Sequence, residues 1–131
     1  WNRMASVKLV PNVNDAGLDY DCYFRSIEDV PKSIISLDAN YCLLNKPAHV
    51  RMTGNFKITV EKLLLYWIKG VEVKDLKWIH QLDYATSGIL CVGLNRKAAA
   101  LASCAFASRT VQKQYLAVLQ GKLDLSAYPI L

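Results

Sequence analysis

The sequence predicts a mixed α/β sheet with helices packed against it, and three observations carry that prediction. Two short apolar runs surround a turn-forming triplet between residues 33 and 44, which is typical of a hairpin. Apolar residues then recur at helical spacing after Thr59 and again after Asn95. Between these two segments, residues 89–92 form a continuous apolar run of the length expected for a buried strand.

The predicted hairpin pairs Ser33–Leu37 with Tyr41–Leu44 through the triplet Asp38-Ala39-Asn40. Asp and Asn favour turns because their side chains bond to nearby backbone groups. Pro47 should end the second strand, since proline has no N–H to donate to a ladder.

Each predicted helix has a capping residue and an apolar face. Thr59 is expected to cap the first helix, which Gly70 can end, and Asn95 is expected to cap the second. The first face consists of Val60, Leu63, Leu64 and Trp67, and the second of Ala98, Leu101, Ala102 and Ala105. The small residues of the second face would let that helix lie close to the sheet.

The remaining stretches are predicted from their composition. Residues 80–88 show no helical spacing and are expected to form an irregular segment before the 89–92 strand. Val111–Leu119 is rich in β-forming residues and precedes Gly121, so we expect a further strand there. Residues 1–32 combine turn-forming residues with little periodicity, which predicts a loop-rich leader or extension before a single domain over residues 33–131.

Composition limits the class of protein and of partner. The 131 residues suffice for one modest domain or a piece of a larger one. Hydrophobic residues make up 53% and charged residues 21%, which argues against disorder. The net charge of +5 suits a polyanionic partner such as RNA, although ordinary enzymes can be equally basic.

The cysteines and the apolar runs predict an intracellular protein without a metal site or a membrane span. The cysteines are far apart, and no Cys-x-x-Cys or His/Cys cluster indicates zinc. Cys91 and Cys104 have apolar neighbours and are expected to be reduced core residues. No apolar run approaches the length of a membrane span, and the first residues contain no apolar signal core.

The stretch most informative about chemistry is His80-Gln81-Leu82-Asp83-Tyr84-Ala85-Thr86-Ser87-Gly88. It places the carboxylate of Asp83 on a non-helical turn. Thr86 and Ser87 could donate hydrogen bonds that orient Asp83, and Gly88 allows a positive φ or a close backbone approach. An Asx-type turn without chemistry is the alternative interpretation.

This order of residues closely resembles the signature His-Arg-Leu-Asp-x-x-Thr-Ser-Gly of the RluA-type pseudouridine synthase family. Two neighbouring motifs agree in order and spacing. Asn45-Lys46-Pro47 looks like the family's upstream Asn-Lys-Pro motif, and Lys113-x-Tyr115 looks like its downstream Lys-x-Tyr strand. The resemblance covers residues 34–122.

The resemblance implies the α+β pseudouridine synthase fold, with a mixed, largely antiparallel sheet and packed helices. It also implies isomerisation of uridine to pseudouridine in structured RNA, after the base has flipped out of its stack. Asp83 would be the catalytic carboxylate, and Tyr115 would remove the proton from carbon 5 of uracil. The enzyme would be a monomer that needs no cofactor or metal, with RNA as its partner.

Further residues are assigned to substrate or RNA binding, namely His80, Gln81, Thr86, Lys46 and Lys113. His80 either contacts the substrate or orients the active-site turn through a backbone bond. Lys46 either meets a phosphate or is a solvated surface lysine. Lys113 would share a strand face with Tyr115, where its cation would favour a base role; a half-buried strand tyrosine without chemistry is the alternative.

Two departures from the family pattern leave a rival function open. Gln81 stands where the family usually has Arg, and it lacks the charge and the planar fork of Arg. The family's later Gly-Arg-Thr-His-Gln segment, which supplies the partner Arg of the catalytic Asp, is absent, so we expect a domain truncated before its later motifs and inactive alone. A non-catalytic RNA-binding or RNA-chaperone relative is the rival. A serine hydrolase centred on Ser87 lacks the Gly-x-Ser-x-Gly elbow.

Overall fold

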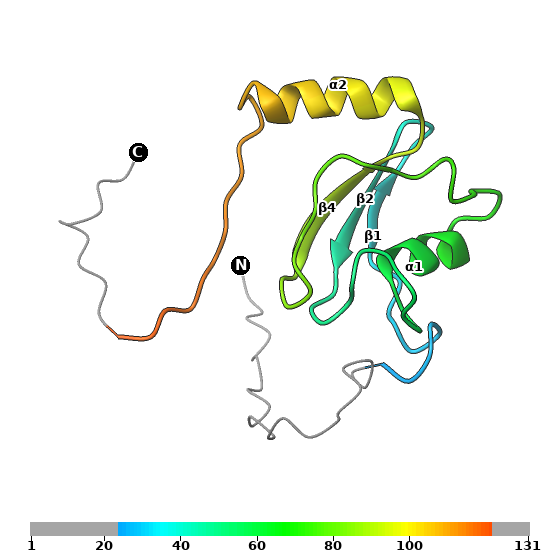
Figure 1. Ribbon diagram of the computed structural model, residues 1–131, viewed down its shortest axis with the longest axis vertical. Coiled ribbons are helices and arrows are strands. Elements are labelled where there is room, and N and C mark those ends of the chain that lie inside the picture. The colour runs from blue at the N-terminus through cyan, green and yellow to red at the C-terminus, as the bar shows by residue number, and fades with distance from the viewer. Residues whose placement is uncertain (1–23, 122–131) are drawn as a thin grey trace.

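The structure, a computed structural model, describes residues 24–121, which form a four-stranded sheet and two helices (Figure 1). The elements in chain order are β1 (Ile34–Leu37), β2 (Tyr41–Lys46), α1 (Val60–Trp67), β3 (Lys77–Trp78), β4 (Gly88–Gly93) and α2 (Arg96–Ala107). The strand order is β1-β2-β4-β3, and every pairing between these strands is antiparallel. The predicted α+β fold with a largely antiparallel sheet is thus confirmed.

Only part of the predicted leader falls in the described range. Residues 24–32 contain bends and a turn, and Val30 is buried in the core. Residues 1–23 of the leader and residues 122–131 of the predicted domain lie outside the described residues.

The predicted hairpin is present, and its turn is fixed by Asp38. Oδ1 of Asp38 accepts hydrogen bonds from the backbone N–H groups of Asn40 at 2.7 Å and Tyr41 at 2.8 Å. These two bonds stabilise the carboxylate and lower the pKa of Asp38. The second strand runs beyond the predicted end at Leu44 and stops at Lys46, immediately before Pro47.

The core lies on the face of the sheet that α1 covers (Figure 1). Alternate residues of β2 and β4 point into it, and with α1 they contribute the fully buried side chains of Cys42, Leu44, Leu90, Val92, Val60, Leu63 and Leu64. Burying one such leucine contributes about 1.5–3 kcal/mol relative to leaving it exposed. Oγ1 of Thr59 accepts a hydrogen bond from the Lys62 N–H at 3.2 Å, which confirms the predicted cap of α1.

The second helix is present, but its predicted apolar face is wrong in part. Oδ1 of Asn95 accepts from the Ala98 N–H at 2.9 Å, which confirms the predicted cap. Ala98 is buried, whereas Leu101 is 61% exposed. The reason is that α2, which crosses one end of the sheet (Figure 1), is covered on the side that carries Ala98, Ala102, Ala105 and Phe106, and Leu101 lies outside that side. Close approach at that end depends on Gly93, where an added Cβ would meet the Ala99 Cβ at 3.1 Å.

The predicted strand over Val111–Leu119 is wrong. Residues 112–119 have no regular secondary structure, and Leu116 and Val118 are 100% and 99% exposed. β-forming residues favour a strand only where a neighbouring strand and a half-buried surface are available to pack against. Within the described residues no strand pairs with this segment. The short strand β3 was not predicted, because two residues are too few to show alternation.

Candidate active site

Residues 80–88 form the irregular segment that the sequence predicted, and it connects β3 with the start of β4. Its centre is a turn in which the Thr86 N–H donates to the Asp83 carbonyl at 3.1 Å. The Asp83 side chain is exposed. Gly88 has φ +131°, a conformation that L side chains rarely adopt, so the predicted use of glycine for a positive φ is confirmed. We call residues 83–88 the Asp83 loop.

Lys46 is placed differently from the expected phosphate contact. Its side chain is 0% exposed, and its ammonium donates to the carbonyl oxygens of Pro47 at 2.9 Å, Tyr84 at 3.3 Å and Thr86 at 2.8 Å. Burial lowers the pKa of Lys46 to about 8, and the negative charge of Asp83 opposes part of that shift. The lysine therefore meets the backbone of the Asp83 loop and has no free surface for a phosphate.

His80 makes the backbone bond that one of the two interpretations required. Its Nε2 accepts a hydrogen bond from the Cys91 N–H at 3.0 Å, and its ring stacks on Phe106 with the centroids 4.8 Å apart. An accepting Nε2 fixes the neutral tautomer with the proton on Nδ1. Burial, followed by the nearby charge of Lys113, lowers the pKa of His80 and favours the same neutral form.

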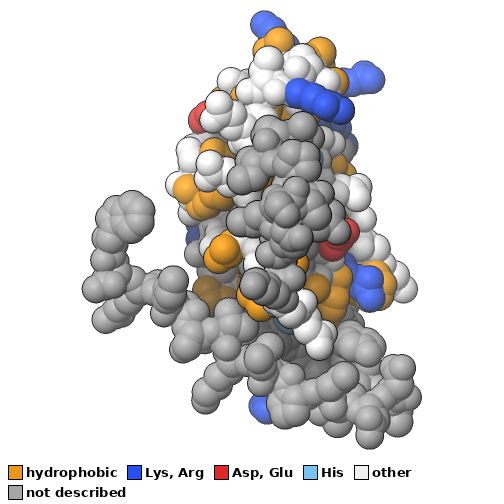
Figure 2. Space-filling view, turned by 90° about the vertical axis from the view of Figure 1, so that its left-hand side faces the viewer, with side chains coloured by type: hydrophobic (Ala, Val, Ile, Leu, Met, Phe, Trp, Pro, Cys, Tyr) orange, Lys and Arg blue, Asp and Glu red, His pale blue; other side chains and the backbone are white. Residues whose placement is uncertain are grey.

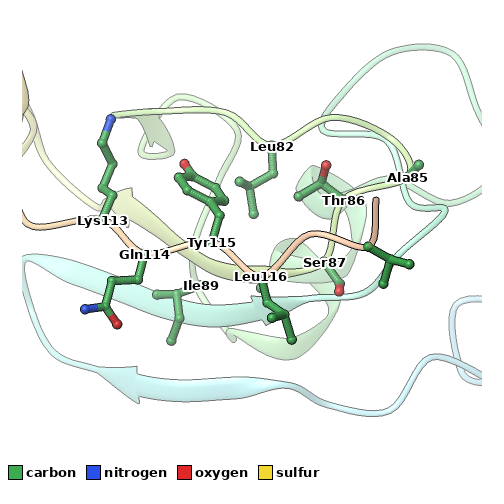
Figure 3. Close-up of a pocket in the computed structure, with 11 residues that line it drawn as sticks. Leu82, Ala85, Thr86, Ser87, Ile89, Lys113, Gln114, Tyr115 and Leu116 are labelled. Atoms are coloured by element: carbon green, nitrogen blue, oxygen red, sulfur yellow. The ribbon is translucent and has the colours of Figure 1, made fainter. Parts of the chain in front are cut away.

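Tyr115 and the Asp83 loop meet at a cleft of about 580 Å³ (Figure 3). One wall comes from the loop and the start of β4, and the other from residues 113–118; Asp83 itself does not line it, although its neighbours Leu82 and Ala85 do. Figure 3 shows Lys113 and Tyr115 projecting to the same side of their segment, toward the chain that carries Leu82. Tyr115 is 70% exposed, so it is not the half-buried tyrosine of the alternative interpretation.

The remaining predicted residues are divided between the cleft and the surface. Thr86 lines the cleft while its carbonyl binds Lys46. Gln81 is exposed and does not line the cleft.

Sequence reasoning missed a cluster of rings beside the Asp83 loop. The guanidinium of Arg51 lies 4.3 Å from the centroid of the Phe56 ring and 5.0 Å from that of Tyr84. The His49 N–H donates to the Tyr84 carbonyl at 2.8 Å, and the two rings meet edge to face. Tyr84 occupies a variable position of the signature, and the other members come from a loop without periodicity, so the sequence carried no signal for this cluster.

Basic side chains gather at the end of the molecule where α2 lies (Figure 2). The exposed residues there are Arg96, Lys97, Arg109 and Lys113, which we call the basic end. Arg96 and Lys97 occupy the first turn of α2, which contains no acidic residue. Cations in a first turn oppose the helix dipole, so helix stability does not explain their position.

Among residues 24–121, no group of three or more His, Cys, Asp or Glu side chains could hold a metal ion. None of the helices in that range is both long enough and apolar enough to cross a membrane.

Comparison with known proteins relates the chain to one family. The profile of the family described as RNA pseudouridylate synthase matches residues 40–129. The human RNA pseudouridylate synthase domain-containing protein 1 is 35% identical over 112 residues, which cover 80% of this chain and 35% of that protein. The ribosomal large subunit pseudouridine synthase C of Rickettsia bellii is 36% identical over 91 residues, covering 68% of this chain and 30% of that protein.

The fold agrees with this relationship. The solved structure of human RNA Pseudouridylate Synthase Domain Containing 1 matches with a TM-score of 0.52 and 36% sequence identity. The match covers 64% of this chain and 30% of that chain. The chain thus spans about a third of the length of the relatives it matches.

Proposed function

The chain belongs to the RluA-type RNA pseudouridylate synthase family, and on that premise we propose that the protein isomerises uridine to pseudouridine in structured RNA. The observation that carries the proposal is the Asp83 loop itself. The loop presents the exposed carboxylate of Asp83. The buried ammonium of Lys46 donates to its Tyr84 and Thr86 carbonyls. The loop also lines the cleft whose other wall includes Tyr115.

The proposed reaction detaches uracil from its ribose, turns the base and rejoins it through carbon 5. Breaking the glycosidic bond develops positive charge at the anomeric carbon, which the Asp83 carboxylate can stabilise or capture. The base is not lost to water, so the reaction needs no second carboxylate as an acid for a departing group. Tyr115 is the proposed acceptor of the proton that leaves carbon 5 when the new carbon–carbon bond has formed.

We assign RNA binding to the basic end and access to the target uridine to base flipping. Exposed Lys and Arg side chains displace counterions from phosphates, which supplies affinity without sequence preference. The target uridine must leave its stack to reach a carboxylate on a protein loop. Gln81 can donate and accept hydrogen bonds where the flipped nucleotide leaves its place in the RNA, but it carries no charge.

The test compares the protein expressed from its complete reading frame with its Asp83→Asn variant. The amide keeps the shape of the carboxylate and removes its charge, so pseudouridine formation should fall at least about 100-fold, the effect of losing an electrostatic stabiliser. Glu61→Gln, which removes a carboxylate from the first turn of α1, is the matched control and should stay active. An Asp83→Asn enzyme with near wild-type turnover would contradict the assignment.

A second candidate function is RNA binding without turnover. The neutral Gln81 at the position where the family usually has Arg favours it. Binding of structured RNA by the wild-type protein, together with no pseudouridine in that RNA, would establish this function in place of the first.

A further inference from the structure

We propose that Arg51 and Phe56 form a subsite for an unpaired nucleotide of the RNA that adjoins the target uridine. The Arg51 guanidinium would bind the phosphate of that nucleotide, and its base would stack on the Phe56 ring. This inference rests on the proposed function, because it takes RNA as the substrate. The subsite is separate from the cleft, since neither residue lines that cleft.

The loop after β2 brings both residues close to the Asp83 loop. Strand β2 ends at Lys46, which pairs with Gly88 at the start of β4, so the two loops lie at the same end of the sheet (Figure 1). The His49 N–H joins them by donating to the Tyr84 carbonyl at 2.8 Å. Since Tyr84 directly follows Asp83, RNA that places a uridine at Asp83 would have its neighbouring nucleotides beside the loop after β2.

Arg51 offers a charge with which no carboxylate among residues 24–121 pairs. Its guanidinium lies over the rings of Phe56 and Tyr84, at 4.3 Å and 5.0 Å from their centroids, and the side chain is exposed. The ion pair within that range joins Lys74 and Glu72 instead. A guanidinium that meets rings through its face keeps the N–H donors at its edge for two oxygens of a phosphate. The rings thus orient the cation without using its donors.

The backbone around Arg51 is held in place without a ligand. The Val60 N–H donates to the Arg51 carbonyl at 2.8 Å, and Arg51 forms a parallel bridge with Thr59, the cap of α1. Residues 51–60 therefore form a loop whose two ends are bonded to each other. A loop ordered in advance loses less conformational freedom on binding, so more of its contact energy contributes to affinity.

Gly54 makes room for the Phe56 ring within this loop. Gly54 has φ +111°, and a Cβ added there would meet Cε2 of Phe56 at 3.0 Å, so the ring lies directly against the glycine. The Lys62 ammonium donates to the Phe56 carbonyl and holds the backbone of the same residue. The ring is nevertheless 37% exposed, although phenylalanine is usually buried. It is an ordered, accessible aromatic surface of the kind on which unpaired bases stack.

An aromatic ring beside a cation matches the two parts of one nucleotide. The base supplies a planar face for Phe56, and the phosphate supplies the negative charge for Arg51. An acidic peptide would satisfy the cation and leave the ring without a planar partner. The bases of a duplex are already stacked on one another, so the ligand that fits both groups is an unpaired nucleotide.

Binding of a single-stranded uridine hexanucleotide by the complete protein tests the two contacts separately. Phe56→Leu keeps an apolar side chain and removes the aromatic face, so affinity should fall at least about fivefold with an unchanged salt dependence. Arg51→Gln removes one phosphate contact, so the slope of log K against log salt should become shallower by about 0.7. The matched controls are Tyr66→Leu and Lys69→Gln, which change an exposed ring and an exposed cation elsewhere and should keep wild-type affinity and slope.

An abasic hexanucleotide distinguishes stacking from a general loss of binding. It keeps the phosphates and lacks the bases, so Phe56→Leu and wild type should bind it equally well. Unchanged affinity of Phe56→Leu for the uridine hexanucleotide, an equal loss for the abasic one, or an unchanged salt slope in Arg51→Gln would each overturn the proposal. Binding of a polyglutamate peptide that depends on Arg51, without binding of the hexanucleotide, would assign the surface to a protein partner and also overturn it.

A further measurement on the wild-type protein needs no variant that folds. With ring-labelled phenylalanine, adding the uridine hexanucleotide should shift the Phe56 NMR signals upfield, because a stacked base places its ring current over the side chain. Adding inorganic phosphate should shift them far less. Phe56 signals that do not respond to the hexanucleotide would contradict the subsite.

Turnover separates failure of the subsite from failure of the proposed function. A contact made equally in the ground state and the transition state raises KM without lowering kcat, so Phe56→Leu should raise KM at least about fivefold, whereas Asp83→Asn lowers kcat. A Phe56→Leu enzyme with wild-type KM would refute the subsite and leave the function standing. If the wild-type protein forms no pseudouridine while the hexanucleotide results hold, the proposed function fails and the subsite remains.

Discussion

Nε2 of His80 accepts a hydrogen bond from the backbone N–H of Cys91 at 3.0 Å. Strand β3 pairs with β4 only at Lys77↔Gly93 and Trp78↔Val92, so the imidazole lies at the next position along that edge. Phe106 of α2 covers one face of the ring. The His80 side chain thus joins residues 80–88 to β4 and α2. It accepts the bond from Cys91 only while its Nε2 carries no proton.

Stability should therefore fall when His80 is protonated. Its pKa is lowered in the folded protein, so the folded state binds fewer protons than the unfolded state near the ordinary histidine pKa. The stabilisation is complete above about pH 6.5 and is lost as the pH falls below that value toward the folded pKa. Chemical unfolding of wild type between pH 7.5 and 5.5 should show this loss.

The control for that measurement is His80→Gln, whose side-chain oxygen can accept the same bond and does not titrate. This variant should lose less stability than wild type over the same pH range. Equal pH dependence of the two proteins would show that His80 is not the titrating group.

Replacing Gly88 with a residue that has a Cβ should strain the backbone without causing a steric clash. An added Cβ would meet nothing within 4 Å, but the backbone has φ +131°. Gly88→Ala should therefore lower the free energy of unfolding by about 1–3 kcal/mol, the usual cost of a residue held in such a region.

Denaturant unfolding checks this value against Gly70→Asn as a control. Gly70 has φ +82° and open space around it, and asparagine tolerates left-handed conformations. A Gly88→Ala chain as stable as Gly70→Asn would contradict the strain argument.

Replacing Arg96 and Lys97 with glutamine should weaken RNA binding without destabilising α2. The cations oppose the dipole in the first turn of α2, so their removal should leave the helix as stable or stabilise it by about 0.3–1 kcal/mol per residue. RNA affinity should fall, and the slope of log K against log salt should become shallower by about 1–2.

The affinity measurement is filter binding of the complete protein at two or more salt concentrations. Lys69→Gln with Lys74→Gln removes the same charge from exposed positions that do not belong to the basic end and is the matched control, with the ion pair of Lys74 and Glu72 lost as well. If both double variants lose the same affinity, net charge and not the basic end determines binding.

Elements with a local cause could be predicted from the sequence. Asp38, Thr59 and Asn95 each bond to a backbone N–H two or three residues away, so the hairpin and both helix starts were visible in short stretches. The signature likewise placed Asp83 on an irregular turn, because the whole motif lies within residues 80–88.

The features that the sequence did not predict depend on distant partners. His80 stacks on Phe106, which lies outside the signature, and the covered face of α2 depends on which side of the helix meets β3 and β4. Lys46 is intermediate. Its place two residues after Leu44 on a strand was a usable sign of burial, but a charged side chain made the solvated interpretation the default.

The last prediction is that the 131-residue chain alone does not form pseudouridine. Among the described residues, no ion pair reaches the Asp83 carboxylate, which is exposed, and Tyr115 opposite the loop is 70% exposed. Electrostatic stabilisation of a developing cation weakens steeply with water access, because the interaction energy falls as the effective dielectric constant rises. The segment after α2 also exposes Leu116 and Val118 almost completely, so that wall of the cleft has no packing of its own.

We therefore expect the chain to bind RNA through its basic end while turning over less than about one hundredth as fast as the product of the complete reading frame, the scale of losing one electrostatic stabiliser. The measurement assays both proteins, at equal concentration, on the same uridine-containing RNA. Circular dichroism of the short chain serves as the control for folding, since an unfolded chain would be inactive for a trivial reason. Comparable turnover by the two would mean that a carboxylate open to water suffices for the chemistry, and that the Asp83 loop with Lys46 and Tyr115 forms a complete site.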